Sequence, residues 1–152
     1  MRFGLLLVAL LSPVPRPSGD QPDARTASEL KHLAGVWAAE PPAADGVRTT
    51  FLFTGAEAGW LAAWQRSRLV DGDREKQIVN LRFYRVTLNP GAKPKQITLT
   101  RGEGDDKETR LGVYEVEGDT LRMAFGREKD RPEKLDDKAA QLLTLKRVKP
   151  KE

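Results

Sequence analysis

Few residues in this chain could do chemistry. His32 is the only histidine, and the chain contains no cysteine. Nucleophilic and general acid–base catalysis need a nucleophile and an oriented base, which is most often histidine. Ser28 and Glu29 are neighbours of His32 in sequence only, and one histidine without a thiolate leaves the usual zinc ligand set incomplete. We therefore expect no catalytic residue, no metal and no cofactor.

Acidic residues form a second candidate site. The densest cluster consists of Glu103, Asp105, Asp106 and Glu108. Oxygen ligands at alternate positions can hold calcium, but this segment lacks the full ligand pattern of an EF-hand. Lys107 and Arg110 would also neutralise the cluster, which favours a solvated hairpin tip.

A third candidate set contains Tyr114, Glu115 and Asp119. Alternation along a strand places Tyr114 and Glu115 on opposite faces, and turn chemistry accounts for Asp119. We expect structural roles for Tyr114, Gly118 and Asp119 and a protein that is not an enzyme.

Aromatic side chains are the most open candidates. Trp60, Trp64, Phe83 and Tyr84 could hold an apolar ligand at the mouth of a β-barrel, or they could fill its core. A cavity of about 300 to 1,000 Å³ lined by these aromatics would favour ligand binding. A filled barrel with an exposed apolar patch would favour protein–protein interaction.

The most strongly patterned element is a β-hairpin over residues 109–126. Its apolar residues alternate on one face and are Tyr114, Val116, Leu121, Met123 and Phe125. Between its two halves, Gly118-Asp119 can supply the positive-φ pair that a two-residue turn requires.

Short strands separated by Gly, Pro, Asn and Asp turns make up the rest of the chain. They are expected from Gly35 onward and over residues 48–54, 60–69, 78–88, 96–101 and 142–147. Trp60 and Trp64 also fit one face of a helix, but the surroundings favour a strand. A short helix is expected from Ser28, its N-cap, to Leu33. The pattern predicts an all-β, antiparallel up-and-down barrel or a sandwich of about eight strands.

Residues 78–88 have apolar side chains of both parities. Val79, Leu81 and Phe83 share one parity, and the other set is Tyr84, Val86 and Leu88. One flat strand cannot bury both sets on one side, so we expect a β-bulge near residues 82–84 or a break into two elements.

The chain is 152 residues long, which suits one domain. Residues 1–19 combine a basic start with an apolar run too short to span a bilayer, which indicates a signal peptide cleaved near Ser18-Gly19. A linker over residues 20–28, a barrel domain over 29–148 and a basic tail over 149–152 follow. Without the signal, 24 basic and 22 acidic residues remain and are interleaved, which argues against nucleic-acid binding.

Several segments, in this order and spacing, point to a family. They are residues 33–37, 93–99, 111–125, 131–132 and 143–147. Together they resemble the small exported, lipocalin-like domains of unknown function that are abundant in planctomycete bacteria. The resemblance covers about residues 30 to 147 and implies a small antiparallel β-barrel, with no known activity and no catalytic residues to carry over. Residues 55–76 match least.

Gly35-x-Trp37 also resembles the first-strand motif of lipocalins. In that family the tryptophan closes the barrel floor, and a basic residue of the last strand lies over it. Here Arg147 or Lys146 could do so, through a cation–π contact of about 0.5 to 2 kcal/mol. Gly35 would let the backbone turn tightly beneath the indole.

We expect an exported, monomeric, non-enzymatic barrel that binds a small apolar ligand or a peptide. The alternative is a protein–protein interaction module of the cell envelope. The periplasm, the cell envelope and the extracellular space are the expected locations, with no stable membrane span after signal removal and no nucleic-acid partner.

Overall fold

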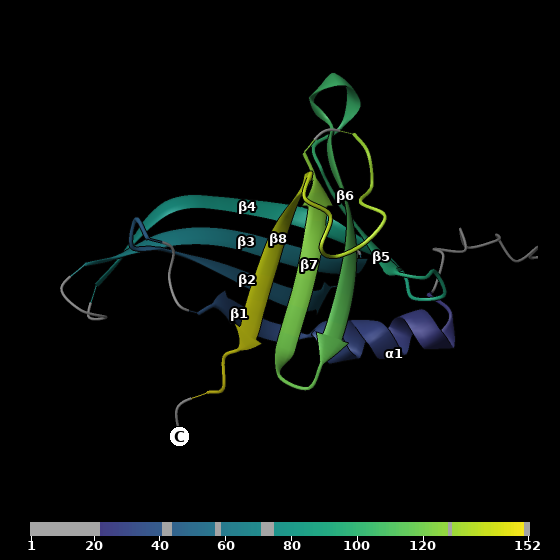
Figure 1. Cartoon of the computed structure of the whole chain (residues 1–152), viewed down its shortest axis with the longest axis horizontal. Helices are drawn as coiled ribbons and strands as arrows, with labels where there is room; N and C mark the ends of the chain where they lie inside the picture. The colour runs from purple at the N-terminus through teal and green to yellow at the C-terminus, as the bar shows by residue number, and fades with distance from the viewer. Residues whose placement is uncertain (1–21, 41–43, 57–58, 71–74, 128, 151–152) are drawn as a thin grey trace, which may run out of the picture.

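Eight antiparallel strands follow one another in chain order around a closed barrel, as the computed structural model shows (Figure 1). It describes residues 22–40, 44–56, 59–70, 75–127 and 129–150. The strands are β1 Gly35–Ala39, β2 Val47–Ala56, β3 Gly59–Val70, β4 Glu75–Asn89, β5 Lys95–Arg101, β6 Glu108–Glu117, β7 Thr120–Gly126 and β8 Ala140–Arg147. The prediction of an all-β, up-and-down barrel is confirmed, as is strand for residues 60–69. The expected signal peptide and its cleavage site lie outside the described residues.

The barrel is flattened into two crossing layers. Figure 1 shows β2, β3 and β4 as long strands across one side, while β6, β7 and β8 cross them steeply on the other side. The helix α1, Ala24–Leu33, lies across the end where the β6–β7 turn is. Its Leu30 and Leu33 are buried in the barrel core, so α1 closes this end.

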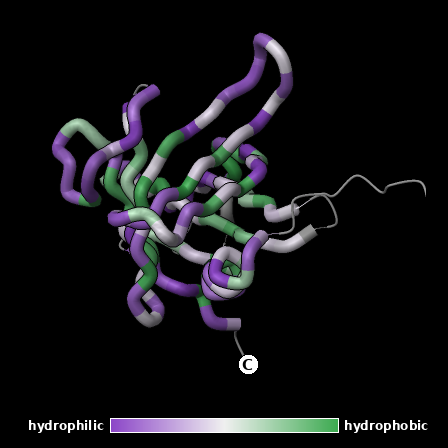
Figure 2. Tube along the Cα trace, turned by 90° about the vertical axis from the view of Figure 1, so that its right-hand side faces the viewer, coloured by the Kyte–Doolittle hydropathy of each residue, from purple (hydrophilic) through white to green (hydrophobic). Residues whose placement is uncertain are grey.

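Alternation along each strand builds the core. Figure 2 shows hydrophobic and hydrophilic residues alternating along the barrel strands. Phe51 and Phe53 of β2 point inward with their ring centroids 5.8 Å apart, and Trp64 of β3 stacks on Phe51 at 5.0 Å. Phe125 of β7 completes the stack 6.3 Å from Trp64. These aromatics fill the middle of the barrel.

The expected hairpin is confirmed as β6 and β7. Glu117 pairs with Thr120 across a two-residue turn, in which Gly118 has a φ of 58°. The Asp119 carbonyl accepts a 2.9 Å hydrogen bond from the Arg147 backbone amide. Its carboxylate lies 3.6 Å from Arg147 Nε and 3.1 Å from Lys149 Nζ. Gly118 and Asp119 therefore have structural roles, and the turn binds the end of β8 through Arg147.

Trp37 closes the floor of the barrel. Its side chain is completely buried, and its Nε1 donates a 2.8 Å hydrogen bond to the Leu33 carbonyl. The Arg147 guanidinium lies 4.1 Å from the indole ring and donates to the carbonyls of Ala34 and His32 at 2.8 and 2.6 Å. The expected contact between the first and last strands is confirmed, with Arg147 in the basic position.

Gly35 is required beside this contact. Its φ is 115°, in the region that favours glycine, and a Cβ there would lie 3.4 Å from Arg147 Nη1. A contact at that distance is ordinary, so it is the backbone conformation of the turn from α1 into β1 that requires glycine.

The helix begins earlier than expected. Asp23 is its N-cap and accepts a 2.8 Å hydrogen bond from the Thr26 amide, so the prediction of Ser28 as N-cap is wrong. Residues 24–28, expected in a linker, belong to α1, because the Asp23 cap satisfies a free amide one turn earlier. Among the described residues, no helix is long and apolar enough to cross a bilayer.

Glu29 docks α1 onto the barrel. Its carboxylate accepts hydrogen bonds from Lys95 Nζ at 2.6 Å and from the Tyr114 hydroxyl at 3.1 Å. Burial alone would raise the pKa of Glu29, but these bonds and the Lys95 charge outweigh it and lower the pKa. Burial, with the charge of Glu29, raises the pKa of Tyr114. Tyr114 thus has the structural role expected for it.

The two apolar sets of residues 78–88 occupy opposite faces of one continuous strand. Tyr84, Val86 and Leu88 are buried, whereas Leu81 and Phe83 are 43% and 62% exposed. The register between β3 and β4 shifts where the consecutive residues Arg66 and Ser67 of β3 pair with Asn80 and Ile78 of β4. The irregularity is therefore not at residues 82–84 as expected. No bulge is needed there because the second apolar set remains on the outer surface.

We predict that Trp37→Ala lowers the free energy of unfolding by about 3 to 5 kcal/mol, because it removes a fully buried indole and its contact with Arg147. Urea denaturation followed by circular dichroism measures the loss. Trp60→Ala is the matched control, since Trp60 is only partly buried, and it should cost clearly less. Equal losses, or an unchanged Trp37→Ala unfolding midpoint, would contradict the assignment.

Candidate functional site

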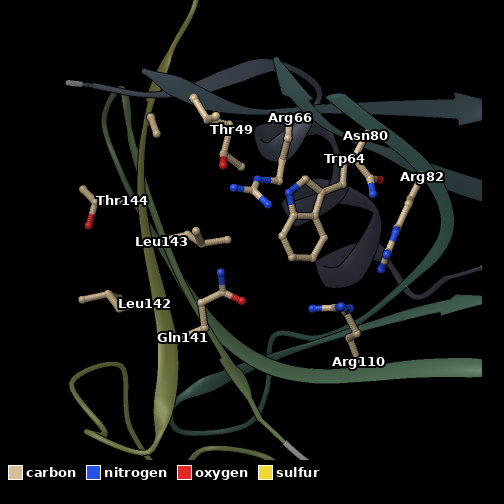
Figure 3. Close-up of a pocket in the computed structure, with 12 residues that line it drawn as sticks. Thr49, Trp64, Arg66, Asn80, Arg82, Arg110, Gln141, Leu142, Leu143 and Thr144 are labelled. Atoms are coloured by element: carbon tan, nitrogen blue, oxygen red, sulfur yellow. The ribbon is translucent and has the colours of Figure 1, made fainter. Parts of the chain in front are cut away.

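A cavity of about 540 Å³ lies at the end of the barrel opposite α1. Residues of β1, β2 and β8 supply an apolar side that includes Ala39, Val47 and Leu143. The side chains on the polar side are Thr49, Arg66, Asn80, Arg82 and Arg110. Trp64 lies between the two sides, and Figure 3 shows the guanidinium groups arranged around its indole.

Strand alternation explains why arginines reach the interior. Arg66 follows Trp64 by two residues on β3, and Arg82 precedes the buried Tyr84 by two residues on β4. On β6, Arg110 has the parity of the buried Tyr114. Positions two or four residues apart on a strand share a face, so these side chains point inward close to the strand ends. There water can reach part of each charged group, which lowers the cost of placing it inside a barrel.

The cavity also opens through the wall of the barrel. β1 pairs with β8 only through residues Leu145 to Arg147, whereas β7 pairs with β8 along its whole length. Within the described part of the chain, the first half of β8 therefore has a strand on one side only. Leu142 and Leu143 point to opposite faces of β8, yet both line the cavity.

Trp64 forms the boundary between the filled core and the cavity. The residue is only 8% exposed and contacts Phe51 on its core side, while the Arg110 guanidinium lies 4.7 Å from the indole ring. Its Nε1 is buried and has no hydrogen-bond partner in the described structure. A buried donor without a partner costs about 1 to 3 kcal/mol, so the fold tolerates an unsatisfied group at the edge of the cavity.

Glu108 anchors the arginines on one side of the cavity. Its carboxylate accepts a 2.9 Å hydrogen bond from Arg110 Nε, a short hydrogen bond from Arg101 Nε and a 3.3 Å hydrogen bond from the Tyr84 hydroxyl. Arg82 Nη1 lies 3.7 Å away. One carboxylate is thus shared among three guanidinium groups, which leaves this side of the cavity positively charged.

The same contacts determine the ionisation of Glu108. Burial alone would raise the pKa of Glu108, but the hydrogen bonds and charges of Arg101 and Arg110 outweigh it and lower the pKa. The hydrogen bond to Glu108 raises the pKa of Arg101. Glu108 is therefore ionised at neutral pH and acts as a counter-ion for the arginines.

The other chemical candidates lie away from the cavity. His32 is exposed on α1, and its backbone carbonyl is bound by Arg147. The short 3₁₀ helix η1, Gly104–Asp106, forms the exposed tip between β5 and β6. Among the described residues, no three His, Cys, Asp or Glu side chains gather where they could hold a metal ion. The donor-rich cavity suits binding of a ligand by hydrogen bonds and charge.

The structure separates the four aromatics expected to bind a ligand. Trp64 lines the cavity, whereas Tyr84 is a core residue that reaches Glu108 through its hydroxyl. Trp60 packs against the core without lining the cavity. Phe83 does not line this cavity, because its parity puts it on the outer face of β4; its role in ligand binding stays a prediction.

The inward-facing arginines were not among the residues predicted from sequence. The signal was present in the parity of Arg66, Arg82 and Arg110 relative to their buried neighbours Trp64, Tyr84 and Tyr114. Interleaved charges along the chain instead suggested a uniformly solvated surface.

No protein-family model, curated protein or solved structure matches the chain. The resemblance to the exported planctomycete domains and to lipocalins therefore stays a prediction from sequence.

We predict that Glu108→Gln lowers the free energy of unfolding at neutral pH by about 1.5 to 3 kcal/mol, the range for hydrogen bonds to charged groups. Because the folded-state pKa is lowered, this stabilisation is complete above the unfolded pKa of about 4.3 and is lost as the pH falls through the folded value. The difference between the wild type and Glu108→Gln should therefore shrink in acid. Urea unfolding at about pH 7 and about pH 3 measures both differences.

Glu115→Gln is the matched control. Glu115 is exposed, and its carboxylate lies 3.5 Å from one arginine, Arg122. Such a surface pair contributes about 0 to 1 kcal/mol, so this variant should change little at either pH. A Glu108→Gln variant that behaves like Glu115→Gln would contradict the role of Glu108 as the counter-ion.

Proposed function

We propose that the protein is an exported, non-enzymatic β-barrel that binds a small ligand in the cavity at its open end. The observation that carries this proposal is the cavity above Trp64, whose volume of about 540 Å³ lies within the range of about 300 to 1,000 Å³ typical of ligand sites. One end of the barrel is closed by α1 and Trp37, and the aromatic stack fills the middle. The open end is therefore the part of the interior that a ligand can occupy.

The lining favours a ligand with both polar and apolar parts. Leu143 and Val47 face it from one side, and three arginines face it from the other. A wholly apolar ligand, as expected from the aromatics, would offer no partner to Arg66, which Glu108 does not hold, and would bury its charge at a cost. The residue types also support a binding role, since the described residues that line the cavity include neither histidine nor a carboxylate that could act as a general base.

Export remains part of the proposal and is supported by the sequence of residues 1–19. The absence of cysteine agrees with any location, because the fold needs no disulfide. Barrel closure and the core aromatics supply its stability instead.

A protein–protein interaction module is the second candidate function. Its support is an exposed apolar row on the outer face of β4, formed by Ile78, Val79, Leu81 and Phe83. Leu52 of β2 extends this row, since Leu52 pairs with Ala63 and Ala63 pairs with Phe83. Contiguous exposed apolar surface of this kind marks interaction sites in soluble proteins.

We predict that Thr49→Trp abolishes binding of small aromatic probes, because its indole would occupy the cavity. Fluorescence titration with N-phenyl-1-naphthylamine and 8-anilinonaphthalene-1-sulfonate measures binding. Thr50→Trp is the matched control, since Thr50 points to the outer face from the same strand, and it should bind both probes like the wild type. If neither probe binds, or Thr49→Trp binds as well as Thr50→Trp, the proposed function is wrong.

For the second candidate, we predict that a photoreactive benzoylphenylalanine at position 83 forms one defined protein adduct in the native organism. The partner would bury its own apolar surface against the exposed row. The same group at position 87 is the control, since Thr87 is exposed on the outer face of the same strand outside the row. Absence of an adduct from position 83, or equal adducts from both positions, would contradict an interaction at this face.

A further inference from the structure

The charge of the cavity is unbalanced. Glu108 is shared by Arg82, Arg101 and Arg110, and among the side chains that the structure describes no acidic one forms an ion pair with Arg66. The walls therefore carry an excess of positive charge next to an apolar side. Partial burial of Arg82 and Arg110 strengthens their attraction for an anion, because water screens them less than it would on an open surface.

A second, independent observation indicates where in the cavity an anion would bind. Trp64 is more than nine-tenths buried, its Nε1 has no partner, and the residue lines the cavity. Figure 3 shows the nitrogen edge of the indole and the Arg66 guanidinium turned toward the same part of the cavity. Arg66 is exposed, so its side chain can shift to admit a ligand atom between the two donors. An indole N–H is a donor only, so the missing partner must be an acceptor.

We propose that the ligand is an amphiphilic organic anion, with a carboxylate, sulfonate or phosphate group held between Arg66 and Trp64 Nε1. This inference rests on the proposed function and names the ligand class of the same cavity. A planar anionic group matches the fork of donors on an arginine, and the indole N–H supplies one more hydrogen bond. The apolar body of the ligand lies along Val47 and Leu143.

Arg82 and Arg110 have a different role from Arg66. Both are held by Glu108, and Arg110 also lies over the indole ring. They keep the cavity positive and hold Trp64 in place, while Arg66 is the arginine available to the ligand. The arrangement therefore divides the arginines into fixed groups and one that binds the anion.

Two probes with the same aromatic skeleton test the inference. 8-Anilinonaphthalene-1-sulfonate carries a sulfonate, and N-phenyl-1-naphthylamine is the same molecule without it. We expect the wild type to bind the sulfonate at least about tenfold more tightly, since the neutral probe cannot form the hydrogen bond to a charged group that accounts for at least about a factor of ten in affinity. Arg66→Gln should remove about tenfold of this affinity and leave the neutral probe within about twofold.

Two further variants separate charge from location. Arg85→Gln is the matched control, because Arg85 is exposed on the outer face of β4 and should affect neither probe. Trp64→Phe keeps an aromatic ring but removes the N–H, and it should weaken binding of the sulfonate more than that of the neutral probe. Phe83→Ser shows whether any probe binds at the outer apolar row, and it should change neither affinity.

The outcomes distinguish the two proposals. Equal affinity for both probes, blocked by Thr49→Trp, would overturn the anion inference and leave ligand binding in the cavity intact. An identical loss in Arg66→Gln and Arg85→Gln would overturn the role of Arg66. Binding of neither probe, or binding that only Phe83→Ser removes, would overturn the proposed function together with the inference.

Discussion

The contact between Trp37 and Arg147 is the interaction on which the rest of the barrel depends. β1 is short and pairs with β8 at only three positions, so few backbone hydrogen bonds join the first and last strands. The Arg147 guanidinium reinforces this seam by stacking on the indole and binding two carbonyls at the end of α1. A closed barrel leaves no edge strand free along the seam, and here one arginine joins the helix, the floor and the last strand.

The same short seam leaves room for the cavity. Beyond Leu145 the early part of β8 is paired with β7 alone in the described structure, and Leu142 and Leu143 face the open space. A longer β1 would pair with these residues and narrow the opening. The short β1 therefore explains the incomplete closure at the mouth, while Arg147 provides the closure at the floor. The aromatic stack of Phe51, Trp64 and Phe125 separates the two ends.

Some features of the fold and of the site were predictable from the sequence, and others were not. The turn at Gly118 and the inward face of the β6–β7 hairpin were predictable, because each depends on local turn chemistry or on period-two alternation. The floor formed by Gly35 and Trp37 was expected only from the resemblance to the first-strand motif of lipocalins. Trp64 was among the predicted binding residues. Phe83 was misplaced because the aromatic type indicated burial, whereas parity decides the face. The cap at Asp23 was missed because a polar segment with proline suggested a linker.

The sequence by itself determined an all-β, antiparallel fold of about eight strands and its hairpin turn, since these features follow from patterns within a few residues of each other. Only the tertiary structure decided which charged side chains meet. Arg66, Arg82, Arg110 and Glu108 come from three different strands, and their distances depend on barrel register and on where β1 ends. The unpartnered Trp64 Nε1 is visible only in three dimensions, because satisfaction of a buried donor depends on every neighbour around it.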